Sequence, residues 1–162
     1  MRVVVAAAVV LVALARAAPA SQTVLDLRVR RDDGTVATLR DVIGNRPTLI
    51  AFWATYCVPC RVEVPALNRA AERWRERGLR VVGVAVETDA ARVRDTRRSW
   101  DMRYDVLTVA PGKPDTTDTS FPRSLPASAF VARGAALLHE GLLDDATLER
   151  LVPALLEGPA PK

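Results

Sequence analysis

Cysteine and histidine are scarce in this chain, which has two cysteines, Cys57 and Cys60, and one histidine, His139, among 162 residues. A closed zinc site takes four ligands, so these residues cannot supply one near the cysteine pair. His139 lies far along the chain in a predicted strand, where we interpret it as a surface or half-buried residue. Aromatic residues make up 5% of the chain, and no stretch interleaves them with basic residues. This argues against nucleic-acid binding.

Long apolar runs are also absent, except at the N-terminus. Residues 1–20 read MRVVVAAAVVLVALARAAPA, with a basic Arg2, an apolar run over 3–15 and an A-x-A-like site at 18–20. This order is typical of a secretory signal peptide, and the run is shorter than the roughly 20 residues of a membrane span. We therefore predict export across a membrane, with an uncleaved N-terminal anchor as the alternative. The following domain would then lie in the periplasm or outside the cell, where disulfides form.

The first part of the remaining chain predicts strands and helices in alternation. Alternating apolar residues over 24–29, followed by Asp32-Asp33-Gly34, predict an N-terminal β-hairpin. The continuous apolar run TLIAFW at 48–53 predicts a strand covered on both faces, and LRVVGVAV at 79–86 predicts a second buried strand. Residues 60–77 have the three-to-four spacing of an amphipathic helix that contains Pro65. A short helical turn is expected at 39–43.

Further along, Thr88-Asp89 offers a cap for a helix over 90–100. The segment 108–124 is rich in Pro, Asp, Thr and Ser and predicts a loop. A hairpin is expected at 125–143, then a helix from Asp144 or Asp145 to Leu156, then a disordered tail at 158–162. This order predicts one α/β domain over 21–157, with a central sheet flanked by helices.

The spacing and the position of the two cysteines suggest chemistry. Cys57 lies where a buried strand ends and a helix begins. A helix N-terminus carries unpaired N–H groups and about half a positive charge, so a thiolate is stabilised there and its pKa falls from about 8.5 toward 7 or below. Cys60 follows one helical turn later and can close a disulfide. The pattern predicts that Cys57 exchanges with a disulfide and Cys60 resolves the mixed disulfide.

Two other interpretations of the pair remain open from the residues alone. An inert staple would stabilise the fold little, because so small a loop removes little entropy from the unfolded chain. Two thiolates could instead hold Cu(I), which leaves a copper-carrying chaperone as an alternative.

The run LIAFWATYCVPCRVEVP, residues 49–65, resembles the active-site segment of thioredoxin-fold proteins, specifically of the TlpA/ResA-like thiol–disulfide oxidoreductases. DDGTVATLRDVIGNRPTLIAFWATYC, GLRVVGVAVETD and LPASAFVARGAALLHEG extend the resemblance over most of the chain after residue 20. It implies a thioredoxin-like fold with a central mixed β-sheet and an extra N-terminal β-hairpin.

The resemblance also implies roles for individual residues. Cys57 would be the exposed attacking cysteine and Cys60 the resolving one, with Pro126 in a cis peptide bond that faces the disulfide. The main chain of Leu125 would then be open to pair with an incoming peptide. Residues expected beside the sulfurs and in contact with substrate are Trp53, Tyr56, Val58, Pro59 and Leu125. The segment TSFPRSLPASAF departs from the family's usual pattern before this proline, so substrate contacts are expected to differ there.

A second departure concerns the proton acceptor for the resolving thiol. Thioredoxins proper carry a buried Asp two residues before the active-site Trp, whereas this chain has Ala51 there. Glu63, one helical turn after Cys60, occupies a position where TlpA/ResA-like proteins carry Glu. A carboxylate half-buried beside a thiol has a raised pKa and can exchange the thiol's proton. The alternative is that Glu63 is a solvated charge on a helix face.

These features predict an extracytoplasmic reductase of protein disulfides that needs no cofactor beyond the Cys57–Cys60 disulfide. Apocytochrome c is one candidate substrate, with electrons supplied by a membrane thiol-reducing donor, and we expect a monomer. A thiol oxidase is a further alternative, but Val58-Pro59 offers no donor to stabilise a reduced thiolate strongly. A peroxiredoxin is disfavoured because the chain lacks the Pro and Thr upstream of Cys57 that shape a peroxide pocket.

Overall fold

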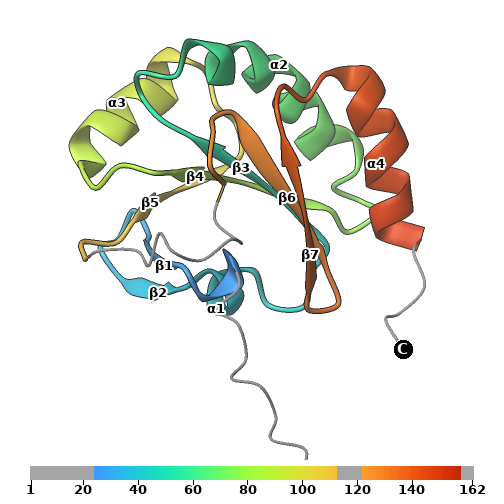
Figure 1. Cartoon of the computed structure of the whole chain (residues 1–162), viewed down its shortest axis with the longest axis horizontal. Helices are drawn as coiled ribbons and strands as arrows, with labels where there is room; N and C mark the ends of the chain where they lie inside the picture. Colours follow the sequence, from blue (N-terminus) through green and yellow to red (C-terminus); the bar gives the residue numbers. More distant parts are fainter. Residues whose placement is uncertain (1–23, 113–121, 158–162) are drawn as a thin grey trace, which may run out of the picture.

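The computed structural model describes residues 24–112 and 122–157. The predicted signal peptide and tail, and much of the predicted loop over 108–124, lie outside the described residues. Figure 1 shows one sheet with helices on both of its faces. The elements in chain order are η1 (Val24–Asp26), β1 (Arg28–Arg30), β2 (Val36–Thr38), α1 (Leu39–Ile43), β3 (Thr48–Trp53), α2 (Val58–Arg73), β4 (Arg80–Ala85), α3 (Ala90–Ser99), β5 (Asp105–Val109), β6 (Ala127–Ala132), β7 (Ala135–Glu140) and α4 (Asp145–Glu157).

The seven strands form a mixed sheet in the order β2-β1-β5-β4-β3-β6-β7. β3, β4 and β5 are parallel neighbours, whereas β6 pairs with β3, and β7 with β6, in antiparallel fashion. The predicted N-terminal hairpin is β1–β2, which extends the sheet beyond β5. Every residue of β3 is buried, which confirms the prediction of a strand covered on both faces.

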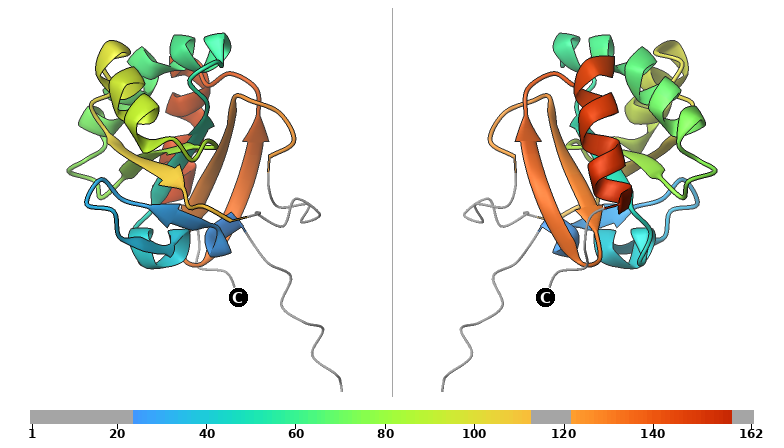
Figure 2. Two further views of the ribbon diagram at one scale, coloured as in Figure 1. Left: turned by 90° about the vertical axis from the view of Figure 1, so that its left-hand side faces the viewer. Right: turned by 90° about the vertical axis from the view of Figure 1, so that its right-hand side faces the viewer.

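Two apolar layers enclose the sheet. One contains the buried side chains of α2, α3 and α4, and the other those of η1 and α1 on the opposite face. Both side views in Figure 2 show this separation of the three longer helices from α1. β3 contributes alternate side chains to the two layers, because successive residues of a strand point to opposite faces.

Three expectations were wrong in detail. Residues 24–26 form a 3-10 helix rather than the start of a strand. β5 was missed, and its last residues, Thr108 and Val109, had been placed in a loop. The helix expected at 60–77 is α2, which starts two residues earlier at Val58 and ends at Arg73. Its start moved because Pro59 lies in the first turn, where a missing N–H costs nothing.

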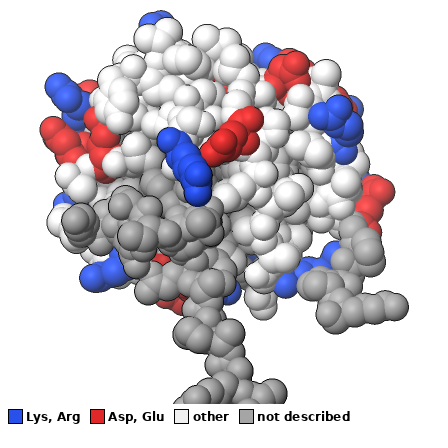
Figure 3. Space-filling view, viewed as in Figure 1, with Lys and Arg blue, Asp and Glu red and all other residues white. Residues whose placement is uncertain are grey.

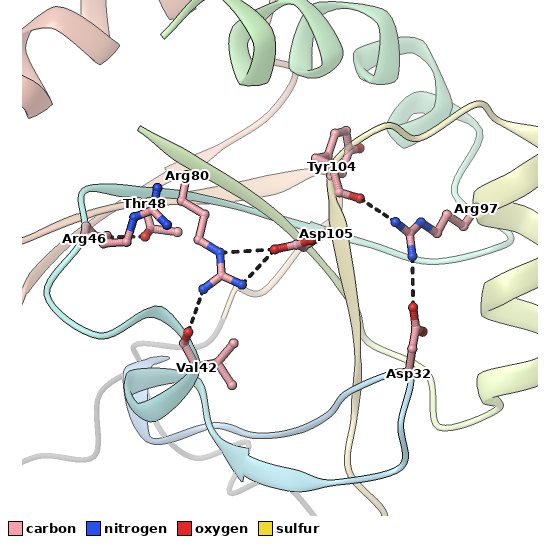
Figure 4. Close-up of polar contacts among 8 residues, drawn as sticks. All are labelled: Asp32, Val42, Arg46, Thr48, Arg80, Arg97, Tyr104 and Asp105. Carbon is pink, nitrogen blue, oxygen red and sulfur yellow. Dashed lines mark hydrogen bonds and ion pairs between the residues drawn. The ribbon is translucent and has the colours of Figure 1, made fainter. Parts of the chain in front are cut away.

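Two arginines form polar contacts that connect α1 and the β1–β2 hairpin to the rest of the domain (Figure 4). The Arg80 guanidinium donates to Asp105 at 2.8 Å and 3.2 Å and to the Val42 carbonyl at 2.6 Å. Arg97 of α3 donates to the Tyr104 carbonyl at 3.2 Å and to Asp32 of the hairpin turn at 3.0 Å. These contacts fix where β5 begins, and with it the position of Tyr104.

Gly83 of β4 packs closely against two aromatic side chains. A Cβ there would lie 3.0 Å from Tyr104 Cε2 and 3.1 Å from Trp53 Nε1. We expect Gly83→Ala to lower the free energy of unfolding by about 1–3 kcal/mol through overpacking, measured by urea denaturation. The loss should shrink when Tyr104 is first replaced by leucine, because the crowded ring is gone. A Gly83→Ala variant as stable as the wild type would show that this packing is loose.

Candidate active site

The cysteine pair lies at the junction between β3 and α2. The chain leaves β3 at Trp53 and turns so that the Cys57 N–H donates to the Ala54 carbonyl at 3.0 Å. Cys57 is the N-cap residue of α2, and a disulfide joins it to Cys60 with the Cα atoms 5.3 Å apart. The structure thus brings both cysteines to a helix N-terminus, as the sequence predicted.

The cap geometry bears directly on the reactivity of Cys57. Its Sγ accepts a hydrogen bond from the Cys60 N–H at 3.2 Å. In the reduced protein the same N–H and the helix dipole would stabilise a thiolate on Cys57. The two residues are 7% and 3% exposed, so Cys57 is less exposed than expected and only slightly more so than Cys60. Cys57 is nevertheless the cysteine that lines the neighbouring groove.

The groove beside Cys57 is open and has a volume of about 620 Å³. Tyr56 and Val58, which line it, are 72% and 73% exposed. In Figure 3 the surface over the start of α2 carries few charged side chains. Apart from Arg123 and Ser124, the residues that line the groove are mostly apolar. The groove is lined by Tyr56, Cys57, Val58, Pro59, Val86, Pro122, Arg123, Ser124 and Leu125.

The structure gathers most of the predicted contact residues here, with one exception. Tyr56, Val58, Pro59 and Leu125 all line the groove. Trp53 does not. It is buried, and its ring packs against Trp100 with the centroids 5.3 Å apart, because its side chain points into the layer beneath α2. Trp53 belongs to the same buried cluster as Cys57 and Cys60, and its contact with substrate stays a prediction.

Pro126 follows Leu125, and the bond between them is cis, as the resemblance implied. Pro126 is buried, and its carbonyl accepts a hydrogen bond from the Gly141 N–H at 2.9 Å. Leu125 is half-buried and lies on the groove side. The structure thus places this segment across the groove from the cysteine pair.

Glu63, one helical turn after Cys60 on α2, is buried rather than half-buried, with 3% of the residue exposed. One carboxylate oxygen accepts a hydrogen bond from the Leu143 N–H at 2.5 Å. Burial raises the pKa of Glu63 to about 7, and this single hydrogen bond offsets only part of that rise. A solvated charge on the helix face is thereby excluded. A carboxyl group with this pKa exchanges protons readily near neutral pH.

Tyr104, the residue before β5, lies near Glu63 and was not predicted from the sequence. Burial, and then the negative charge of Glu63, raise the pKa of the Tyr104 hydroxyl above its usual range. The phenol therefore stays protonated beside the carboxylate.

Thr55 and Glu87 were also missed. A Glu87 oxygen accepts from the Thr55 N–H at 2.6 Å, and the other from the Thr55 hydroxyl at 2.8 Å. The parallel pairing of β3 with β4 was the available signal, since residues that follow parallel neighbours meet at one edge of the sheet.

Among the described residues, no group of three or more His, Cys, Asp or Glu side chains is placed to hold a metal ion. His139 pairs with Ser128 across β6 and β7, is half-buried, and lies outside the groove. No helix within 24–112 and 122–157 is long and apolar enough to cross a bilayer.

Comparison with known proteins gives a family match and a related protein. The AhpC/TSA family model matches residues 20–110. A thiol-disulfide oxidoreductase ResA from Bacillus thuringiensis subsp. konkukian is 28% identical over 109 residues, which are 67% of this chain and 61% of that protein. The chain thus matches less than two thirds of this relative's length.

Solved structures show the fold. A thiol:disulfide interchange protein of the thioredoxin family from Chlorobium tepidum has a TM-score of 0.64 at 20% identity, covering 86% of this chain and 99% of that one. A secreted Mycobacterium tuberculosis disulfide oxidoreductase, described as homologous to E. coli DsbE, has a TM-score of 0.61 at 18% identity, with 81% and 95% covered. The expected thioredoxin-like fold is confirmed.

Proposed function

Because the chain belongs to the AhpC/TSA family and has a thioredoxin-like fold, we propose that it is a thiol–disulfide oxidoreductase that reduces protein disulfides through Cys57 and Cys60. The observation that carries the proposal is the Cys57–Cys60 disulfide at the N-cap of α2, with Cys57 lining an apolar groove. A purely structural disulfide would have no reason to face such a groove.

In the first step the Cys57 thiolate attacks one sulfur of a substrate disulfide. A bond forms between Cys57 Sγ and that sulfur, the substrate's S–S bond breaks, and its second sulfur leaves as a thiolate. The Cys60 N–H, at hydrogen-bond distance from Cys57 Sγ, favours the attacking thiolate. A peptide lying in the groove beside Leu125 would present its disulfide to Cys57.

In the second step Cys60 resolves the mixed disulfide. The Cys60 thiol gives its proton to the Glu63 carboxylate, and the Cys60 thiolate attacks Cys57 Sγ. The Cys57–Cys60 disulfide forms and the substrate leaves with its remaining sulfur as a thiolate. Two electrons have then moved from the protein to the substrate. Glu63 fits this role because it is buried one helical turn from Cys60 and has a pKa near 7.

The proposal extends to location and partners. We propose that the signal-like residues 1–20 direct export and that a membrane thiol donor returns electrons to the pair. The similarity of the fold to that of a secreted disulfide oxidoreductase supports the proposed export. Apocytochrome c is the substrate that we propose to test first.

The test is reduction of insulin disulfides by the pre-reduced protein, together with its reduction potential. We expect the protein to reduce insulin much faster than free dithiol does. We also expect a reduction potential nearer to about −270 mV, which is typical of reductants, than to about −120 mV, which is typical of strong oxidants. A CxxCH peptide disulfide should be reduced in the same assay. A potential near −120 mV would favour the thiol oxidase, and tight stoichiometric Cu(I) binding would favour the chaperone.

A further inference from the structure

Glu87 lies outside the residues that exchange electrons or protons, yet it contacts the turn that carries Cys57. It follows β4 by two residues and is half-buried. Both of its carboxylate oxygens accept from Thr55, one from the N–H at 2.6 Å and the other from the hydroxyl at 2.8 Å. Thr55 lies two residues before Cys57.

The sheet explains why this contact forms at this place. Trp53 pairs with Ala85 at the ends of β3 and β4, and the Val86 N–H donates to the Trp53 carbonyl at 2.9 Å. Beyond this point the two chains separate, so the Thr55 N–H has no strand partner. The Glu87 side chain supplies the missing acceptor, and a half-buried N–H without one would be costly.

The contact joins two walls of the groove. Val86, beside Glu87, lines one part of it, and Tyr56 and Cys57, after Thr55, line another. The turn over 54–57 is closed by a single backbone bond, from the Cys57 N–H to the Ala54 carbonyl. The contact between Thr55 and Glu87 therefore adds a constraint on this turn from the chain that follows β4.

We infer that Glu87 is a positioning residue for disulfide exchange, holding both donors of Thr55 so that the turn presents Cys57 to a substrate in the groove. The inference rests on the proposed function, because it concerns the rate of that reaction. What matters is the pair of hydrogen bonds rather than the negative charge. Small misplacements of a reacting group slow a reaction substantially.

The experiment compares rates of insulin reduction on the high-pH plateau, where Cys57 is a thiolate in every variant. Glu87→Ala should lower the plateau rate about tenfold. Glu87→Gln removes the charge but keeps one carbonyl acceptor, and should stay within about threefold of the wild type. Thr55→Val keeps the charge but loses the hydroxyl bond, and should also slow the reaction by about threefold.

The matched control is Asp89→Ala in the same loop. Asp89 also accepts two backbone N–H bonds, from Ala91 and Arg92, both at 3.1 Å, but these cap α3. This variant should lose stability and keep the plateau rate. If Glu87→Ala kept the plateau rate, or if Glu87→Gln were as slow as Glu87→Ala, the inference would be overturned.

If Glu87→Ala failed to fold, the plateau rate of insulin reduction by Thr55→Val would test the inference instead. A rate equal to that of the wild type would contradict it. An inactive wild type in the same assay would instead contradict the proposed function.

Discussion

Replacing Cys57 by serine is expected to lower the rate of insulin reduction by about a thousandfold or more, to the level of the buffer dithiol. The physical reason is that Cys57 is the cysteine on the groove and at the N-cap, so no other thiolate can start the exchange. The remaining Cys60 is 3% exposed and lies deeper in the helix. Turnover by the reduced variants, followed by insulin turbidity, measures the effect.

Cys60→Ser is the matched variant and should fail at a different step. It keeps the Cys57 thiolate, so it should attack the substrate and then accumulate as a mixed disulfide that cannot be resolved. Non-reducing electrophoresis should show this adduct for Cys60→Ser and none for Cys57→Ser. Equal adducts from both variants would contradict the assignment of attacking and resolving roles.

Glu63→Gln should slow resolution of the mixed disulfide by about a hundredfold at pH 7 while leaving attack by Cys57 unchanged. The glutamine has nearly the same shape and its side-chain carbonyl can still accept from the Leu143 N–H. It cannot take the Cys60 proton. Stopped-flow measurement with a fluorescent peptide disulfide separates attack from release, and equal release rates in the two proteins would remove Glu63 from the mechanism.

The same substitution should change how stability depends on pH in the oxidised protein. The pKa of Glu63 is about 7 in the folded protein against an ordinary 4.5, so folding favours the protonated carboxyl. This stability is fully present below about pH 4.5 and is lost as pH rises through 7, by about 3 kcal/mol in all. Glu63→Gln should lack that loss in urea denaturation at pH 5 and pH 8.

The control for both measurements is Glu72→Gln. Glu72 is an exposed glutamate on the same helix, α2. This variant should follow the wild type in its release rate and in its loss of stability between pH 5 and pH 8. A Glu72→Gln variant that matched Glu63→Gln would assign the effects to the net charge of the helix.

Patterns local to the chain predicted most of the fold. The all-apolar run of β3 and the Asp89 cap of α3 were sufficient, because burial on both faces and capping leave a direct mark on composition. β5 was missed because its polar first residue and the Pro- and Thr-rich stretch after it resemble a loop. Its strand state depends on pairing with β4 and β1, which no local pattern encodes.

The candidate site, too, was predicted from the sequence only where its residues lie close together in the chain. Cys57, Cys60 and Glu63 lie in one short segment, so spacing alone places them together. Burial of Glu63 could not be predicted from spacing, because Leu143, whose N–H it accepts from, lies 80 residues away. The same holds for Glu87 and Thr55, 32 residues apart, which meet only because β3 and β4 pair. That the Trp53 side chain lies in the layer beneath α2 could not be predicted either, because proximity to Cys57 in sequence does not give the direction of a side chain.

The most direct test of the redox assignment is a thiol count after single turnover. The fully reduced protein is mixed with an equimolar peptide disulfide, alkylated, and analysed by mass spectrometry. If Cys57 and Cys60 are the redox pair, both lose their free thiols as an intramolecular disulfide forms. Each substrate molecule then gains two free thiols. If both cysteines were still free after mixing, and so became alkylated, while the substrate disulfide stayed intact, the account would be contradicted.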